Sequence, residues 1–425
     1  MSSSYFRRSV FGAAGVVPAL LAFQVTKYRR STRERFVMGE GPDTDTAEYP
    51  RLVSAMTGAP VRHGNRVEIM RNGQTLDAMV EAIAAAKATI DCSSYIYWPG
   101  EAADRFSEAF VERARAGVEV NLVLDGYGSA KLDEAHLERL RQGGVNVSIF
   151  RPPRVHTLKK LNNRMHRRIM IVDGVLAFAG GVGIADVWTG NAEDPEHWRE
   201  THLRIEGPAV LDLFGAFLEN WIEATSGIVA GSRLGEIEGF DDGVALQVTR
   251  STPTGGATAA TELFYTAIAG SQRRLWLTTA YFAPDRTFED VLCEAARRGV
   301  DVRILVNGRE VDKEVARQAG RRSYDKLLEA GVRIFEYDKT MLHAKVLVVD
   351  EGWANVGSCN FDSRSFDLDL EVNVVLLDPA LVEELCGHFL EDLEVSQEID
   401  RDTWKQRPLR KRAGELATEL VRQSL

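Results

Sequence analysis

Short apolar runs alternate with amphipathic helical stretches along most of this chain, and the same alternation occurs twice. Strand-like runs lie at 89–98 and 274–284, and each precedes a helical stretch that ends at a glycine before the next apolar run. The runs IMIV at 169–172 and VLVV at 346–349 hold apolar residues only, as in strands that are buried on both faces. Strands that alternate with helices in this way predict an α/β fold.

The second half of the chain repeats the first half. The helix-and-strand stretch AFVERARAGVEVNLVLD at 109–125 resembles VLCEAARRGVDVRILVN at 291–307. We therefore predict two tandem pseudo-symmetric units, residues 65–235 and 245–395. Each unit should be a mixed β-sheet flanked by helices, and the active site should lie between the two units.

The most informative segment follows the repeated strands and helices in each half. MHRRIMIVDG in the first half aligns without gaps with LHAKVLVVDE in the second, and EGPAV later aligns with LDPAL. Each half thus carries a histidine, a cation two residues later and two carboxylates. All eight are candidate catalytic residues. The aligned pairs are His166 with His343, Arg168 with Lys345, Asp173 with Asp350, and Glu200 with Glu371.

These residue types suit chemistry at a phosphodiester. In a strand, a histidine and the cation two residues later project to the same face, and an approximate two-fold axis brings both sets to one interface. One imidazole can attack phosphorus while the other protonates the leaving oxygen, and the cations stabilise the charge that builds on phosphate; no metal is required. Glu200 and Glu371 are candidates for fixing the tautomer of each histidine, whereas Asp173 is followed by glycine and indicates the turn that ends a strand.

The motif of the second half resembles a known family signature. H-x-K-x4-D followed by G-S-x-N is typical of the phospholipase D superfamily, and it is matched by His343, Lys345, Asp350, Gly357, Ser358 and Asn360. The first half departs from it, because Arg168 stands at the lysine position and Gly183 at the asparagine position. The resemblance covers roughly residues 67–395. The run WRETHLRIEGPAV at 198–210 and the apolar N-terminal segment are similar to bacterial cardiolipin synthases.

This resemblance implies a two-step phosphatidyl transfer through a phosphohistidine, without metal or cofactor. It implies that His166 is the nucleophile, that His343 acts first as acid and then as base, and that Ser358 and Asn360 bind the substrate phosphate. The substrates are expected to be phospholipids, with phosphatidylglycerol as donor and cardiolipin as product. The alternative is a phospholipase D that hydrolyses phospholipid to phosphatidic acid; a nuclease and a non-catalytic membrane scaffold rank below both.

Charge is spread unevenly over the chain and weighs against nucleic acid as a partner. The net charge is −10, made up of +6 for residues 1–35, −20 for 36–400 and +4 for 401–425. An acidic body repels a polyanion, whereas basic ends suit an anionic membrane surface. No oligomeric state follows from these features.

The N-terminal segment Ser9–Val25 carries no charge and is slightly short for a membrane-spanning helix. Five basic residues follow it and two precede it, which favours a single anchor in the cytoplasmic membrane with the catalytic body in the cytoplasm. A cleaved signal peptide and an interfacial or packed helix are the alternatives. The remaining expected parts are an anchor with its basic flank at 1–40, a linker at 41–64 and a basic C-terminal helix at 396–425.

Other candidate residues carry weaker signals. Aromatic residues at the ends of two strands can line an acyl or glycerol pocket or pack in the core: Tyr95, Tyr97, Trp98, Tyr281 and Phe282. Six histidines have no partner in the repeat and are expected to be structural: His63, His136, His156, His197, His202 and His388. Four cysteines stand far apart and are expected to be buried apolar residues, not zinc ligands: Cys92, Cys293, Cys359 and Cys386.

Overall fold

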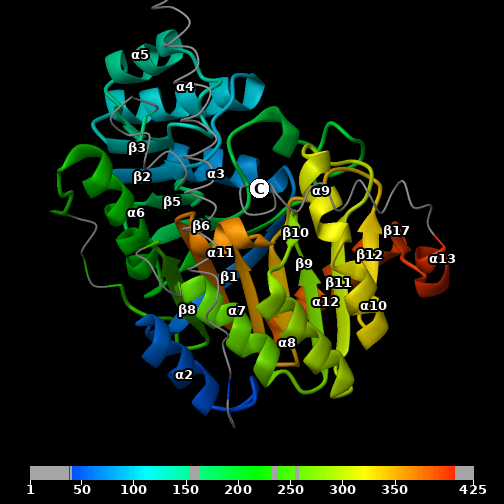
Figure 1. Cartoon of the computed structure of the whole chain (residues 1–425). Coiled ribbons are helices and arrows are strands. Elements are labelled where there is room, and N and C mark those ends of the chain that lie inside the picture. Colours follow the sequence, from blue (N-terminus) through cyan, green and yellow to red (C-terminus); the bar gives the residue numbers. More distant parts are fainter. Residues whose placement is uncertain are drawn as a thin grey trace, which may run out of the picture.

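A mixed sheet of 15 strands runs through both halves of the chain in the computed structural model (Figure 1). The structure describes residues 38, 41–152, 163–231, 235, 237–253 and 258–406. The strand order is β17-β12-β11-β9-β13-β14-β16-β8-β1-β7-β6-β5-β2-β3-β4. In the first half the strands are β1 (Val61–Arg71), β2 (Thr89–Ser94), β3 (Glu119–Asp125), β4 (Asn146–Phe150), β5 (Ile169–Val172), β6 (Leu176–Gly180) and β7 (Thr201–Glu206). In the second half they are β8 (Val244–Ser251), β9 (Arg274–Thr278), β11 (Asp301–Asn307), β12 (Arg333–Tyr337), β13 (Val346–Val349), β14 (Trp353–Gly357), β16 (Glu371–Leu377) and β17 (Ser396–Glu398).

The order of the strands reflects the duplication in the sequence. Strands β1 and β8 pair at the centre, and the series β7-β6-β5-β2-β3-β4 on one side corresponds to β16-β14-β13-β9-β11-β12 on the other. Strands β2, β3 and β4 of the first half are parallel, and so are β9, β11 and β12 of the second half. The strands nearer the centre are antiparallel, and β17 adds an antiparallel edge strand beside β12. Two short strands, β10 (Phe282–Ala283) and β15 (Phe361–Asp362), form a separate parallel pair. The predicted α/β fold with two tandem units is confirmed.

Helices cover both faces of the sheet. One apolar core continues across both halves beneath α6 and α12. On the opposite face, one core lies under α3, α4 and α5 in the first half and another under α2, α7, α8 and α10 in the second. The helices are α2 (Glu48–Thr57), α3 (Gln74–Ala85), α4 (Glu101–Arg115), α5 (Glu134–Gln142), α6 (Val210–Thr225), α7 (Ala259–Gly270), α8 (Arg286–Arg297), α9 (Glu314–Arg321), α10 (Tyr324–Ala330), α11 (Ser363–Asp367), α12 (Pro379–Glu394) and α13 (Arg401–Lys405), with the 3-10 turn η2 (Asp186–Trp188).

Local sequence explains several of these elements. Strands β5 and β13 are buried along their whole length, as their apolar composition predicts. Helix α12 starts at Pro379, and the Asp378 carboxylate before it accepts a hydrogen bond from the Leu381 N–H at 2.9 Å. All four cysteines are free thiols in buried positions, as expected for small apolar residues.

The segment expected to be a linker contains regular structure. Residues 41–64 include helix α2 and the start of β1. The ring of Tyr49 is fully buried against Trp353 at 6.1 Å, and its hydroxyl lies 3.3 Å from Thr266 Oγ1. The helix was not predicted because only Tyr49 and Val53 are buried in it, so its apolar stripe is too narrow to give a clear helical period.

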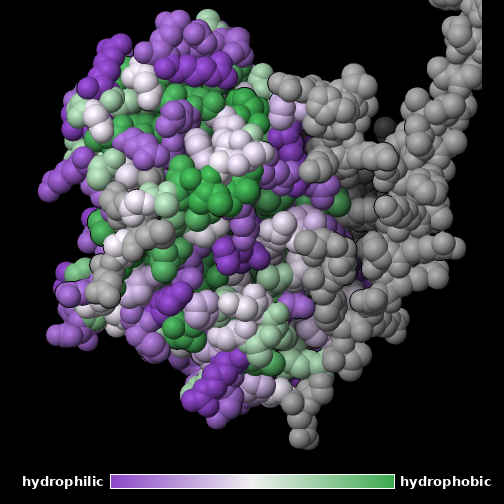
Figure 2. All heavy atoms as spheres, turned by 90° about the vertical axis from the view of Figure 1, so that its left-hand side faces the viewer, coloured by the Kyte–Doolittle hydropathy of each residue, from purple (hydrophilic) through white to green (hydrophobic). Residues whose placement is uncertain are grey.

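The described surface carries few large exposed apolar side chains. Figure 2 shows the side of the molecule that bears α6, where hydrophobic and hydrophilic residues are mixed. Leu211, Ile222 and Ile228, in α6 and just after it, are exposed. Within the described ranges no helix combines the length and apolar character that crossing a bilayer requires. The segment Ser9–Val25 and most of the predicted C-terminal helix lie outside the described residues.

Candidate active site

The two histidines of the repeated motif meet in one pocket. His166 comes three residues before β5 and His343 three residues before β13, at equivalent places in the two halves. Both line a cavity of about 340 Å3 between the halves. The expectation that both histidines face one cleft is therefore met.

Each histidine segment pairs with a segment of the other half. The His166 N–H donates to the Leu370 carbonyl at 3.0 Å, and the His343 N–H donates to the Arg199 carbonyl at 2.7 Å. Leu370 and Arg199 directly precede the two glutamates of the repeat. The backbone thus places the glutamate of each half beside the histidine of the other half.

The carboxylates are crossed between the halves as a result. Glu371 lies beside His166, with its two oxygens 2.9 and 3.1 Å from Nδ1. Glu200 hydrogen-bonds the Nδ1 atom of His343 in the same way. Both carboxylates are fully buried. An Nδ1–H that donates to a carboxylate leaves the ring's lone pair on Nε2, which is the tautomer that a nucleophile or base needs.

Each histidine ring is in contact with the motif cation of its own half. Arg168 Nη2 is 3.0 Å from His166 Nε2, and Lys345 Nζ is 2.9 Å from His343 Nδ1. Arg168 and Lys345 are only 3% and 2% exposed, so a phosphate that reaches them leaves bulk water. Positive charge in such a dry site acts strongly on an anion. Arg168 therefore supplies the same buried positive charge in the first half that Lys345 supplies in the second.

Burial governs the protonation of these groups. It lowers the pKa of both His166 and His343 well below the usual value, and the neighbouring Arg168 and Lys345 lower these pKa values further. Both imidazoles are therefore neutral at pH 7 in the free protein. Burial also lowers the pKa of Lys345 to about 7 and raises that of Glu200 to about 7. A bound phosphate favours the charged form of each cation and so reverses part of this effect.

The serine and asparagine of the second motif differ in their roles. Asn360 lines the pocket, and its buried Oδ1 has no hydrogen-bond partner among the described residues. Ser358 does not line the pocket. Its hydroxyl donates to Glu371 at 2.5 Å and accepts the Val372 N–H at 3.0 Å. Ser358 therefore supports the carboxylate behind His166, and only Asn360 of the two reaches the pocket.

The first half replaces both of these residues by glycine, and only the loss at Gly183 was noted in the sequence. Trp188 fills the space beside Gly183, because a Cβ there would lie 2.8 Å from the indole. Glu200 fills the space beside Gly181, where a Cβ would lie 2.3 Å from a carboxylate oxygen. Gly181 is the counterpart of Ser358, a correspondence that the gap-free alignment already contained.

The two motif aspartates lie at the far end of their strands. The Asp173 carboxylate accepts the N–H groups of residues 87–89, at the start of β2. Asp350 accepts those of residues 272–274, at the start of β9. Both aspartates adopt a left-handed backbone conformation, with φ of 53° and 51°. They join the ends of two strands, and the structure does not bring them into the pocket.

Aromatic residues form much of the pocket wall. Tyr95, Trp98 and Tyr281 line the pocket, and the Tyr95 ring packs edge-on against His166 at 4.8 Å. Tyr97 is fully buried in the core of the first half, and Phe282 packs in the core of the second. The five predicted aromatic residues thus divide between pocket and core.

Two buried arginines that the sequence analysis missed hold the crossed segments. Arg167 is fully buried and donates from Nε to the Glu371 carbonyl at 3.1 Å. Arg199 donates to Asp392 of α12 at 3.0 Å. The repeat gave no signal for either, because their counterparts in the other half are Ala344 and Leu370.

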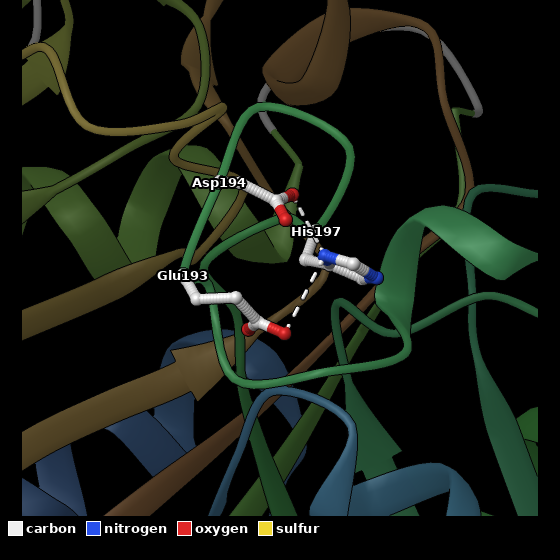
Figure 3. Close-up of side chains that lie close together, drawn as sticks. All are labelled: Glu193, Asp194 and His197. Carbon is white, nitrogen blue, oxygen red and sulfur yellow. Dashed lines mark hydrogen bonds and ion pairs between the residues drawn. The ribbon is translucent and has the colours of Figure 1, made fainter.

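The other described histidines stand apart from the pocket. None of His63, His136, His197, His202 and His388 lines it, and His156 lies outside the described residues. Figure 3 shows His197 with Glu193 and Asp194, the one grouping in the described part of the chain whose side chains are close enough to share a metal ion. His197 Nδ1 lies 2.7 Å from Asp194, so the cluster also closes its own surface loop.

Comparisons with known proteins agree with this geometry. A protein-family model described as "Cardiolipin synthase, PLD-like domain" matches residues 79–220 and 264–393. The cardiolipin synthase of Geobacillus sp. (strain WCH70) is 34% identical over 375 residues, which cover 87% of this chain and 74% of that protein. The cardiolipin synthase of Geobacillus kaustophilus (strain HTA426) is 35% identical over 382 residues, with the same coverage of both proteins.

A solved structure shares the fold. The phosphatidylserine synthase of Haemophilus influenzae Rd KW20 superposes with a TM-score of 0.65 at 15% identity, over 88% of this chain and 100% of that one. The duplicated motif, the shared pocket and the sequence relatives lead to the same assignment. The chain is a phospholipid-modifying enzyme that belongs to the cardiolipin synthase family of the phospholipase D superfamily.

Proposed function

We propose that this enzyme makes cardiolipin by moving a phosphatidyl group from one phosphatidylglycerol molecule to another, with release of glycerol. The observation that supports the proposal is the crossed pair of His–Glu contacts in one pocket, His166 with Glu371 and His343 with Glu200. Relatives that carry the name cardiolipin synthase over most of the chain support the choice of product.

In the first step, the Nε2 atom of His166 attacks the phosphorus of the donor lipid. A P–N bond forms, the P–O bond to the headgroup glycerol breaks, and His343 gives its proton to the departing oxygen. Arg168 and Lys345 stabilise the negative charge on the other phosphate oxygens, and Asn360 donates from its amide. Because both imidazoles are neutral in the free protein, His343 gains its proton when the anionic substrate arrives.

In the second step, the hydroxyl of an acceptor phosphatidylglycerol attacks the phosphorus. His343 takes the proton of this hydroxyl, a new P–O bond forms, and the P–N bond to His166 breaks. His343 thus regains the proton that it gave up in the first step, and His166 loses the phosphatidyl group, so the enzyme returns to its starting state. If water attacks instead, the product is phosphatidic acid.

The family resemblance assigns the nucleophile to the first half. The two histidines are otherwise nearly equivalent, so the assignment to His166 rests on this resemblance and requires its own test. Asp173 and Asp350 act in this scheme by fixing strand ends, and Ser358 by holding Glu371. We retain the units 65–235 and 245–395 as the two halves of the site.

We also propose that the enzyme works at the cytoplasmic membrane. The uncharged segment Ser9–Val25 and the basic residues that flank it support an anchor with the catalytic body in the cytoplasm. Removal of residues 1–35 should shift the protein to the soluble fraction, or leave it extractable by salt. A mature N-terminus just after Ala22 would contradict this assignment and identify a signal peptide.

Product analysis tests the reaction directly. Purified enzyme is incubated with phosphatidylglycerol vesicles, and the lipids are separated and identified. Cardiolipin together with an equal amount of glycerol is the expected result, and His166→Ala and His343→Ala should each abolish it. Phosphatidic acid as the sole lipid product would contradict transfer and establish the hydrolase.

A further inference from the structure

Two lysines that no part of the mechanism uses line the same pocket. Lys131 follows β3 by six residues, and Lys313 follows β11 by six residues, so they occupy equivalent positions in the two halves. Lys131 Nζ lies 3.4 Å from the centre of the Trp98 ring, and Lys313 Nζ lies 4.8 Å from that of Tyr281. The duplication has thus placed a second pair of cations at this site, outside the motif.

These lysines differ from the motif cations in exposure and in their contacts. Lys131 and Lys313 are exposed, whereas Arg168 and Lys345 are almost fully buried. No carboxylate of the described residues lies within ion-pair distance of either lysine. Each ammonium instead rests on an aromatic face, which holds its position without neutralising its charge.

The acidic residues of the pocket wall are engaged elsewhere. Asp312, next to Lys313, accepts a hydrogen bond from the Tyr281 hydroxyl at 2.7 Å. Asp362 accepts the Ser365 N–H at the start of α11, and Asp369 is bonded to Arg364. Neither lysine forms a direct ion pair with these aspartates, so both ammonium groups can still bind an anion.

The proposed reaction places a second phosphate outside the reacting centre. The donor phosphate occupies the buried cations, and the hydroxyl that attacks it belongs to the headgroup glycerol of the acceptor. The acceptor's own phosphate is attached to the other end of this short glycerol. It must therefore lie in the same pocket, close to the reacting phosphate. Outside the motif, four cations line this pocket: Lys131, Arg164, Lys313 and Arg364. Of these, only the two lysines are exposed.

We propose that Lys131 and Lys313 bind the phosphate of the acceptor lipid and so select a phosphate-bearing acceptor over water or free glycerol. The proposal rests on the transfer reaction proposed above. An ammonium group suits this role because it acts as a compact point charge and does not demand one fixed geometry. A hydrolase, whose acceptor is water, has no use for such a pair.

Two soluble acceptors that differ only by a phosphate test the proposal. Labelled phosphatidylglycerol in vesicles serves as donor, and glycerol and glycerol 3-phosphate compete as acceptors. The preference is the ratio of the rates at which the phosphatidyl group is transferred to glycerol 3-phosphate and to glycerol. This ratio should fall at least tenfold in the Lys131→Gln/Lys313→Gln double variant. The rate of transfer to glycerol itself should change less than threefold. The double Lys→Arg variant should keep the preference, and Lys87→Gln serves as control because Lys87 is exposed and does not line the pocket.

Each outcome bears on one proposal only. Equal loss of both acceptors in the Gln variant would overturn the acceptor site, because the lysines would then act on the donor. An unchanged preference would overturn it as well. Failure of the wild-type enzyme to release glycerol from phosphatidylglycerol would instead contradict the proposed transfer reaction.

Discussion

Restoring the missing motif serine in the first half should damage the enzyme. Sequence motifs alone suggest that Gly181→Ser brings the first site closer to the second, where Ser358 supports Glu371. The structure predicts the opposite, because a Cβ on Gly181 would lie 2.3 Å from an oxygen of Glu200 and 2.5 Å from its carboxyl carbon. Ordinary contact begins near 3.4 Å, so the carboxylate must retreat by about 1 Å.

The displaced carboxylate should impair His343, the histidine that acts as acid and base. Glu200 is fully buried and hydrogen-bonds His343 Nδ1, so a displaced carboxylate no longer holds the imidazole in place. A misplacement of about 1 Å in a catalytic group costs about 100-fold in rate. This corresponds to about 2.7 kcal/mol in the activation free energy.

The assay is the initial rate of cardiolipin formation from phosphatidylglycerol vesicles, with the thermal unfolding midpoint measured alongside. Gly181→Ala shares the Cβ and should lose a similar factor. Gly387→Ser is the control, because a Cβ there meets nothing within 4 Å. A Gly181→Ser enzyme as fast as the wild type would refute the claim that Glu200 must occupy this space.

Three further predictions address the crossed site. Glu371→Gln should slow the release of glycerol in a single turnover by about 10²–10⁴-fold, because His166 loses the partner that fixes its tautomer. An unchanged rate of glycerol release would show that the contact is not functional. kcat/KM should fall as pH rises above about 7, because burial lowers the pKa of Lys345 to about 7 and its charge is lost above that pH. Lys345→Arg should move this decline to higher pH, and a profile that does not move would assign it to another group. Arg168→Lys should change the rate of cardiolipin formation by about tenfold or less, since the charge is kept and only the planar geometry is lost; a complete loss would mean that the guanidinium geometry is essential.

The sequence predicted the parts of the site that the duplication repeats. The apolar strand after each histidine, the cation two residues on and the later glutamate were all found by aligning the two halves. The alignment could not predict which glutamate contacts which histidine. Whether Glu371 pairs with His343 of its own half or with His166 of the other depends on how the halves pack, and no local pattern contains this information.

Side-chain roles within the motif were harder to predict. Ser358 and Asn360 look alike as phosphate ligands, but only Asn360 lines the pocket, because the Ser358 hydroxyl turns to Glu371. Asp350 stands in the signature beside catalytic residues, yet a four-residue strand carries it away from the pocket. Helix α2 was missed because too few of its residues are buried to give a helical period.

The most direct test of the account is to locate the covalent intermediate. Enzyme mixed rapidly with phosphatidylglycerol is denatured within the first turnover, digested, and its peptides are analysed by mass spectrometry. The account predicts a phosphatidyl group on the peptide that contains His166, and none in the His166→Ala variant. An adduct on His343 instead, or cardiolipin formed with no adduct on either histidine, would contradict it.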